Sequence, residues 1–238
     1  MKKLMVAALI VVLLTSGLLV SCGGVLIGSG NLETKDYDFN EFSKVEISSA
    51  FEFEISQSSS YSISVTADDN VIEKVQVTKE GETLKIGLKT IPGLGPVTMK
   101  ATVTMPQLRG LDISGGSRGT VSDFSSNENL DLNISGASKV TGDITAGDAD
   151  FEVSGASTIQ LEGSANDMVA KVDGASRFNL GGFTVNDANV SFSGASSGTV
   201  NLSGKLDANL RGASKLSYIG EPTMGSINTS GASTLSKK

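Results

Sequence analysis

A tetrapeptide of small residues, Ser-Gly-Ala-Ser, recurs with small changes through the C-terminal half of this 238-residue chain. The intervals between the central glycines of its seven copies are 21, 19, 19, 20, 18 and 19 residues. Repetition at such a period is typical of stacked repeat proteins, in which each unit packs only on its neighbours. The central glycines are Gly115, Gly136, Gly155, Gly174, Gly194, Gly212 and Gly231.

Apolar and polar residues alternate on either side of the tetrapeptide. Before the second copy the apolar positions are Leu130, Leu132 and Ile134, and after the third copy they resume at Ile159 and Leu161. A period of two is typical of a strand with one buried face. Two strands joined by a tight corner and repeated at equal spacing predict an all-β fold, a parallel β-helix with about seven regular coils of ~19 residues. Parallel crossover connections are generally right-handed, and we expect that hand here.

The corner explains why the tetrapeptide consists of small residues. A chain that changes direction within two or three residues needs a position that accepts a positive φ, which glycine does without steric cost. We therefore expect the seven central glycines to be structural corner residues. The second serine of each copy falls on the inward side of the alternation, which predicts a buried ladder of hydroxyl groups, spaced by ~4.8 Å, that bond to one another and to the corner backbone. These serines are Ser117, Ser138, Ser157, Ser176, Ser196, Ser214 and Ser233.

The composition excludes several kinds of enzyme. The chain has no histidine, so a Ser-His-Asp triad, a histidine general base and histidine-ligated zinc or iron are excluded. The repeated serines have no evident base to activate them, and we predict no catalytic residue, no metal site and no cofactor. There is no tryptophan and aromatic residues make up 5% of the chain, which predicts a core of small aliphatic side chains.

The first 21 residues have the features of a bacterial lipoprotein signal peptide. Lys2 and Lys3 precede an apolar run from Leu4 to Val20, and the sequence Leu-Val-Ser-Cys then ends at the only cysteine, Cys22. This ending resembles the lipobox of bacterial lipoproteins, which implies export, cleavage before Cys22 and lipidation of its thiol. The alternative is an uncleaved transmembrane helix, for which the apolar run is marginal in length.

The residues that follow Cys22 indicate how the folded domain is linked to the lipid and in which membrane the protein resides. Residues 22–31 are rich in glycine, which favours a flexible link between the lipid and the folded domain. Gly23 and Gly24, where an aspartate would retain enterobacterial lipoproteins at the inner membrane, favour the outer membrane. We therefore predict a lipid-anchored protein of the cell envelope, in the outer membrane or a periplasm-facing membrane of a Gram-negative bacterium.

The net charge of the chain disfavours some classes of binding partner. Without residues 1–21, the chain keeps 17 basic against 26 acidic residues, a net charge of −9. Such a charge argues against nucleic acid or anionic lipid headgroups as partners.

The N-terminal half is rich in strands but less regular. Residues 44–57 repeat the order of strand, small-residue corner and strand, and residues 75–88 predict a hairpin. Stacked coils leave open strand edges at their ends. We therefore expect residues 32–107 to continue or to cap the helix, and residues 108–238 to form its regular repeats.

Two groups of charged residues recur outside the predicted core. Paired carboxylates could serve glycoside hydrolysis, and a column of aspartates could bind Ca²⁺. Repeats of 18 to 21 residues leave no room for the long loops that build most catalytic grooves, so we expect these charges to keep the strands soluble. The basic group is Arg118, Lys139, Arg177 and Lys215, and the acidic group is Asp112, Asp131, Asp150 and Glu152.

Several short motifs follow one another in a particular order. They are GSGN at 28–31, FSKVEISSAFEFEI at 42–55, SVTADDNV at 64–71, GETLKIGLK at 81–89 and the run of SGAS repeats. In this order they resemble the putative auto-transporter adhesin, head GIN domain family of bacterial exported proteins, over nearly all of residues 28–238. The resemblance implies a β-helical fold and a surface or periplasmic location.

A rod that displays the same polar side chains at fixed spacing suits weak, multivalent contact with a repetitive partner. We therefore predict a non-catalytic binding, adhesion or scaffold module, with a glycan or a protein surface as its ligand. The alternative is a polysaccharide lyase or hydrolase that uses the outward aspartates and glutamates. The open edge near Lys237 and Lys238 predicts a monomer or an end-to-end dimer.

Overall fold

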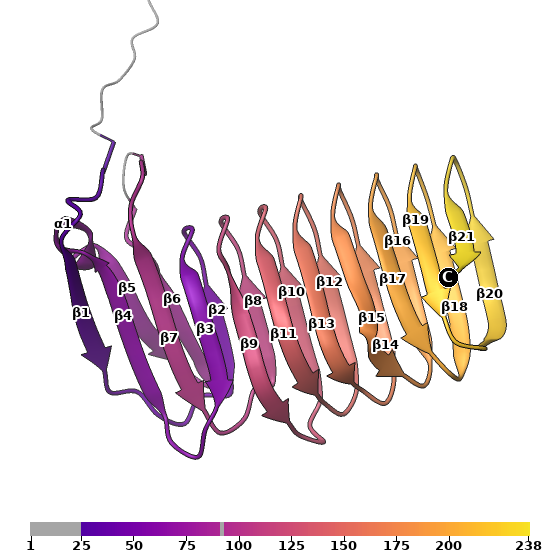
Figure 1. Ribbon diagram of the computed structural model, residues 1–238, viewed down its shortest axis with the longest axis horizontal. Coiled ribbons are helices and arrows are strands. Elements are labelled where there is room, and N and C mark those ends of the chain that lie inside the picture. Colours follow the sequence, from indigo (N-terminus) through magenta and orange to yellow (C-terminus); the bar gives the residue numbers. More distant parts are fainter. Residues whose placement is uncertain (1–24, 91–92) are drawn as a thin grey trace, which may run out of the picture.

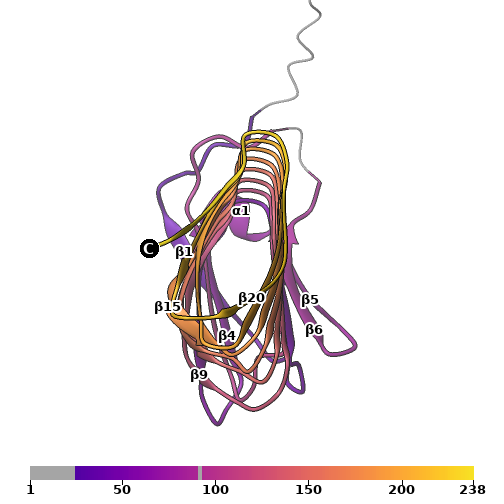
Figure 2. The same ribbon diagram turned by 90° about the vertical axis from the view of Figure 1, so that its right-hand side faces the viewer.

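The computed structural model describes residues 25–90 and 93–238. It is an elongated stack of coils in which two long sheets face each other (Figure 1). Viewed along the stack, the coils superpose into a flattened oval with one sheet on each long side (Figure 2). This confirms the predicted parallel β-helix, a solenoid of about seven turns at a spacing of ~19 residues.

The sheets have eleven and ten strands, and we call them the 11-stranded and the 10-stranded sheet. In spatial order the 11-stranded sheet consists of β1 (Leu32–Tyr37), β4 (Ser62–Asp68), β7 (Met99–Met105), β3 (Glu52–Gln57), β9 (Arg118–Ser125), β11 (Lys139–Thr145), β13 (Thr158–Ser164), β15 (Arg177–Val185), β17 (Ser197–Leu202), β19 (Lys215–Ile219) and β21 (Thr234–Lys237). The 10-stranded sheet consists of β20 (Thr223–Thr229), β18 (Lys205–Leu210), β16 (Ala188–Phe192), β14 (Met168–Val172), β12 (Ala149–Val153), β10 (Leu130–Ile134), β8 (Gly110–Ile113), β2 (Lys44–Ile47), β6 (Thr83–Leu88) and β5 (Val75–Glu80). A single-turn helix, α1 (Asp69–Ile72), lies at the N-terminal end of the stack (Figure 1).

Each regular coil takes one strand from each sheet. A short strand of the 10-stranded sheet leads into the glycine corner, and a strand of the 11-stranded sheet follows it. Neighbouring coils pair in parallel, and the register places equivalent residues one coil apart. The interior is therefore a set of columns of apolar side chains, and in the middle coils the residues that precede the corner are each at most 1% exposed. These residues are Ile134, Val153, Val172, Phe192 and Leu210.

The N-terminal region adds two coils in an order that differs from the order of the sequence. Strands β2 and β3, joined by a corner at Ser49 and Ala50, pair directly with β8 and β9 of the first repeat. Their other edges are covered by β6 and β7, which come later in the chain. The chain thus completes one coil, leaves it to build the end of the stack, and returns past it to begin the repeats.

Antiparallel strands close this end of the solenoid. β1 pairs with β4, β4 pairs with β7, and β5 pairs with β6, all in antiparallel orientation. The outermost strands at the opposite end of the two sheets are β21 and β20, which pair in parallel with their neighbours. The regular parallel stack therefore changes to antiparallel pairing only at its N-terminal end.

Phenylalanine rings fill much of the interior, which corrects the expected core of small aliphatic side chains. In the middle coils the ring centroid of Phe178 lies 5.4 Å from that of Phe151 and 5.9 Å from that of Phe192, with both pairs edge to face. The prediction failed because a low aromatic content says nothing about where the rings go, and here nearly all of them point inward. Eight of the nine are buried: Phe42, Phe51, Phe53, Phe124, Phe151, Phe178, Phe183 and Phe192.

Residues 26–30, which precede β1, are held against the end of the stack, although the sequence predicts a flexible tether over residues 22–31; residues 22–24 lie outside the described part of the chain. The backbone N–H of Leu26 donates to the carbonyl of Gly93 at 2.9 Å, and the N–H of Gly95 donates to the carbonyl of Leu26 at 2.8 Å. The buried carboxylate of Asp68 accepts hydrogen bonds from the N–H groups of Gly30 and Thr98, each at 2.7 Å. These bonds fix a glycine-rich segment whose composition alone favours flexibility.

The predicted signal peptide, residues 1–21, and the predicted lipidation site, Cys22, lie outside the described residues. Within residues 25–90 and 93–238, no helix is long and apolar enough to cross a membrane. The helix α1 spans four residues.

Candidate functional site

The corner glycines stand in single file, each close to the backbone of the corner one coil earlier. The corners that lead from the 10-stranded to the 11-stranded sheet form the upper edge of the stack in Figure 1. All seven have a positive φ, between 64° and 77°. A Cβ atom added at Gly174 would lie 2.3 Å from the carbonyl oxygen of Gly155, one coil earlier, and would overlap with it. The torsion angle and the close stacking of the corners therefore both require glycine.

The corner changes its turn geometry along the stack. In three early corners two successive residues have a positive φ, whereas from Gly155 onward only the glycine does. In the later corners the alanine N–H donates to the glycine carbonyl of the coil before, as Ala175 does to Gly155 at 2.8 Å. These bonds add a contact between corners to the pairing of the strands. The early pairs are Ser49 with Ala50, Gly115 with Gly116, and Gly136 with Ala137.

The repeated serines point inward but form only part of the predicted hydroxyl ladder. The six from Ser117 to Ser214 are at most 2% exposed, and Ser233 in the last coil is half-buried. Ser196 donates from Oγ to the carbonyl of Ser193 at 2.8 Å and lies 3.4 Å from the hydroxyl of Ser214. Among the described residues, Ser196 and Ser214 are the only neighbours in this column whose hydroxyls lie within hydrogen-bond distance of each other, so a continuous ladder does not form. The hydroxyls of Ser117, Ser138 and Ser176 have no hydrogen-bond partner.

Two of these serines should respond oppositely to removal of the hydroxyl. Ser176→Ala removes a buried, unpaired hydroxyl, so the free energy of unfolding should stay equal or rise by up to about 1 kcal/mol. Ser196→Ala removes a bonded hydroxyl and should lower it by about 1 kcal/mol. Urea unfolding followed by circular dichroism measures both. Equal losses in the two variants would show that the hydroxyl of Ser176 is also bonded.

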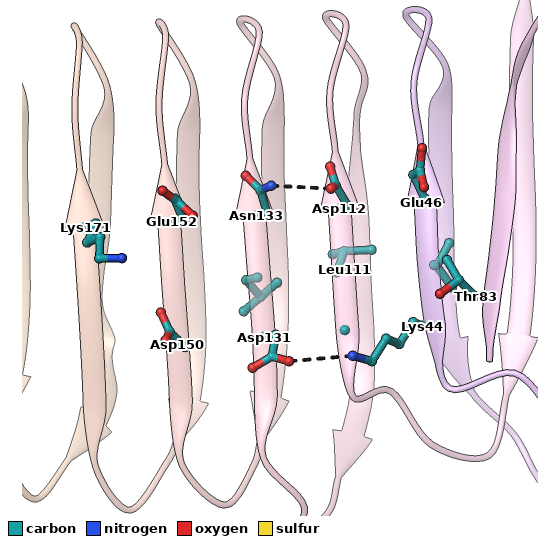
Figure 3. Close-up of a pocket in the computed structure, with 13 residues that line it drawn as sticks. Lys44, Glu46, Thr83, Leu111, Asp112, Asp131, Asn133, Asp150, Glu152 and Lys171 are labelled. Carbon is teal, nitrogen blue, oxygen red and sulfur yellow. Dashed lines mark hydrogen bonds and ion pairs between the residues drawn. The ribbon is translucent and has the colours of Figure 1, made fainter. Parts of the chain in front are cut away.

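A shallow groove of about 390 Å³ lies on the outer face of the 10-stranded sheet. It extends over strands β2, β8, β10, β12 and β14, and Figure 3 shows its charged side chains on successive strands. Gly110 of β8 lies in the row that continues with Asp131 and Asp150, and its missing side chain leaves space between Lys44 and Asp131. The charged lining residues are Lys44, Glu46, Asp112, Asp131, Asp150, Glu152 and Lys171.

The acidic residues that the sequence groups together fall into two rows. Asp131 and Asp150 are register partners in one row. Asp112 and Glu152 belong to the next row, nearer the corner, where Asn133 lies between them. The single predicted group is therefore corrected to two rows, because Asp112 pairs with Asn133, two residues beyond Asp131.

Ion pairing and burial shape the electrostatics of the groove. Lys44 Nζ reaches across Gly110 to within 3.8 Å of Asp131 Oδ2, and Asn133 Nδ2 donates to Asp112 Oδ2 at 3.3 Å (Figure 3). Partial burial raises the pKa of the Asp112 carboxyl, and the negative charge of Glu46 raises it further against the opposing hydrogen bond from Asn133. Five carboxyl groups face two ammonium groups here, so the groove favours ligands that donate hydrogen bonds or carry positive charge.

The chemistry available to this groove is limited by its shape. A carboxyl group with a raised pKa beside other carboxylates is one requirement of glycoside hydrolysis. The groove, however, is open, and its walls are side chains of flat strands rather than loops that enclose a substrate. Among residues 25–90 and 93–238, no group of three or more histidine, cysteine, aspartate and glutamate residues could hold a metal ion. The arrangement therefore suits binding of an extended polar ligand.

The sequence did not reveal that the N-terminal coil contributes to this groove. Lys44 and Glu46 reach it because β2 lies directly against β8. The strand pattern of residues 44–57 is visible in the sequence, but their place next to the first repeat is not, since β6 and β7 separate them from it along the chain.

A family model described as putative auto-transporter adhesin, head GIN domain matches residues 41–222. The match runs from the start of the coil of β2 and β3 to the end of β19, and so includes the groove and most of the repeats. No curated protein matches the chain.

Several solved structures share the fold over 90% of this chain. A putative adhesin from Bacteroides fragilis is 24% identical, with a TM-score of 0.84 and 100% of its own chain covered. A putative adhesin from Parabacteroides merdae is 18% identical, with a TM-score of 0.70 and 98% covered. A putative lipid binding protein from Parabacteroides distasonis is 20% identical, with a TM-score of 0.61 and 100% covered. At these identities the likeness shows a common fold.

Proposed function

Because this chain belongs to the putative auto-transporter adhesin, head GIN domain family, we propose that it is a non-catalytic binding module of the bacterial cell envelope, anchored to a membrane through lipid on Cys22. The observation that carries the binding role is the register of the two sheets, which sets outward polar side chains in straight rows along the rod. Such rows suit many weak contacts with a repetitive partner. The solved structures that share the fold are those of putative adhesins and of a putative lipid binding protein, which agrees with a role in binding.

The anchoring is supported by the sequence around Cys22 and by the segment that follows it. Leu26, the first docked residue, lies four positions beyond Cys22, a span of at most about 14 Å. Val25, Ile27 and Leu32 at this end are each more than half exposed. A short connection and exposed apolar side chains fit an end of the rod that rests close to a lipid surface.

Lipidation has a direct test in cells that express the full chain. The wild-type protein should incorporate radiolabelled palmitate and sediment with the membrane fraction, whereas Cys22→Ala should do neither. Ser21→Ala keeps a small residue before the cysteine and should behave as wild type. Equal palmitate labelling of Cys22→Ala and wild type would overturn the proposed anchor.

The alternative, a polysaccharide lyase or hydrolase, draws on the carboxyl groups of the groove. We expect no new reducing ends and no unsaturated products when the protein is incubated with acidic polysaccharides. Turnover that disappears in Asp150→Ala and Glu152→Ala would replace the binding role with an enzymatic one.

A further inference from the structure

A column of side chains follows the corner on the outer face of the 11-stranded sheet. Each member is the residue after a repeated serine. From Lys139 onward its backbone N–H donates to the serine carbonyl one coil earlier, as Lys139 does to Ser117 at 2.9 Å and Arg177 to Ser157 at 2.8 Å, whereas the N–H of Arg118 donates to the carbonyl of Phe51 at 2.9 Å. No bulge interrupts the register at this position. The column is therefore straight and fixed by the buried serines. Its members are Arg118, Lys139, Thr158, Arg177, Ser197, Lys215 and Thr234.

Cations and hydroxyl groups alternate along this column. From the second repeat onward, Lys139, Arg177 and Lys215 occupy every second coil, and the coils between them and after them carry Thr or Ser. Adjacent coils lie ~4.8 Å apart, so these three positive charges recur at an interval of about 10 Å. The interval between the charges is therefore two coils, twice the length of one sequence repeat.

Within residues 25–90 and 93–238, the cations of the column have no protein partner. Among the described residues, Arg118, Lys139, Arg177 and Lys215 form no ion pair and no side-chain hydrogen bond, and all four are exposed. Other cations do pair with carboxylates, as Lys100 with Glu54 at 2.8 Å. In a chain with a net charge of −7, four unpaired cations in one file are available to an external anion.

The next row on the same face carries only uncharged hydrogen-bonding groups along the repeats. Its members lie two residues further along each strand, so the two rows form one continuous strip. At its first coils the strip borders a groove of about 290 Å³ that Arg118, Lys139, Thr120 and Thr141 help to line. The row is Thr120, Thr141, Gln160, Asn179, Thr199, Ser217 and Ser236.

Acidic residues lie at the borders of this strip. Glu52 continues the column beyond Arg118 at the N-terminal end. Asp123, Asp143 and Glu162 lie four or five residues further along their strands than the members of the column. This separation corresponds to a distance of about 13 Å or more along the strand. A negatively charged ligand is therefore favoured along the rod and disfavoured across it.

We propose that this strip binds a linear anionic glycan in which every second sugar carries a carboxylate or sulfate. An extended sugar residue spans close to one coil spacing, so the acidic groups meet the cations while the neutral sugars lie over Thr158 and Ser197. The hydroxyl and amide row beside the column bonds to the sugar hydroxyls. Single-stranded nucleic acid fits less well, since neither row contains an aromatic residue on which bases could stack.

The proposal rests on the binding role proposed above and names its ligand. Each exposed ion pair alone raises the affinity only about 1.4- to 5-fold, so the affinity depends on simultaneous contacts along the polymer. Long chains should therefore bind much more tightly than the disaccharide, and the affinity should fall as salt is added.

The test uses the full chain purified in mild detergent and titrated with hyaluronate, an alternating acidic and neutral polymer. Wild type should bind hyaluronate and not neutral dextran. The triple variant Lys139→Gln, Arg177→Gln, Lys215→Gln should bind at least about tenfold more weakly with a smaller salt dependence. The matched variant Lys74→Gln, Lys89→Gln, Lys205→Gln has the same net charge, alters exposed lysines outside both the strip and the groove of the 10-stranded sheet, and should bind as wild type.

A second pair of substitutions tests the spacing itself. Thr158→Lys with Ser197→Lys fills the column with a cation in every coil from Lys139 to Lys215, which should shift the preference from hyaluronate towards polygalacturonate, whose sugars are all acidic. Circular dichroism checks that each variant is folded.

Three results would overturn the proposal: wild type that binds no anionic polymer, equal affinity of wild type and the strip variant, or an equal loss in the two triple variants. None of them bears on palmitate labelling of Cys22, so failure of the ligand and failure of the anchor are distinguishable.

Discussion

Gly174→Ala should lower the free energy of unfolding by about 3 kcal/mol, although it adds a single methyl group. Gly174 has a φ of 75°, where a Cβ atom costs roughly 1 to 2 kcal/mol. The new Cβ would also lie 2.3 Å from the carbonyl oxygen of Gly155, which already accepts the hydrogen bond of Ala175. One of the two stacked corners must move, and the bond between them is strained or lost.

Gly116→Ala is the matched control for this substitution. Gly116 also sits in a corner with a φ of 82°, but a Cβ added there meets no atom within 4 Å. Gly116→Ala should therefore lower the free energy of unfolding only by the cost of a Cβ atom at a positive φ, about 1 kcal/mol. Urea unfolding followed by circular dichroism measures both values. Losses of equal size would mean that the stacking of the corners adds nothing to the requirement for glycine.

The repeat made the regular part of the fold predictable from the sequence. Each copy of the tetrapeptide combines a residue that accepts a positive φ with an inward serine, and strict alternation fixes which side chains face the core. The file of Gly136, Gly155 and Gly174 and the burial of Ser138, Ser157 and Ser176 follow from that period. In a stack with one register, a local pattern also specifies which residues become neighbours.

The same reasoning could not place features that depend on contacts between distant segments. Strand β2 lies against β8, with β6 on its other side, and no local pattern contains this order because it is set by packing at the end of the stack. The charges of Lys44 and Glu46 in the groove depend on that placement. A shift of two residues in register likewise separates Asp112 from Asp131, although both precede their corners by a few residues.

The sequence also could not predict which serine hydroxyls form hydrogen bonds at the corners. The sequence shows that Ser176 and Ser196 occupy equivalent positions. In the structure the hydroxyl of Ser196 is hydrogen-bonded, whereas the hydroxyl of Ser176 has no partner among the described residues. The difference depends on the rotamer that each coil allows, which a sequence period does not encode.

Phe178→Ala should have the largest effect of any single substitution considered, a loss of about 3 to 5 kcal/mol in the free energy of unfolding. The ring is fully buried and lies edge to face with both Phe151 and Phe192, so it joins three coils across the two sheets. Removing it leaves a cavity that the flat strands cannot close without losing their register. Phe178→Leu retains most of the volume and should cost only about 1 kcal/mol. Phe39→Ala, at a partly buried ring, should cost less than Phe178→Ala.

The location of the damage distinguishes a stack from a globular core. Each coil packs only on its neighbours, so Phe178→Ala should raise amide hydrogen exchange first in β13, β15 and β17 and leave the distant pair β4 and β7 protected. Arg177 precedes the substituted residue and takes its place in the cation column from the bond between its N–H and the carbonyl of Ser157. Loss of protection at that amide should therefore accompany weaker binding of hyaluronate. Uniform loss of protection from β1 to β21 would mean instead that the molecule unfolds as one unit and that its coils do not act as separate layers.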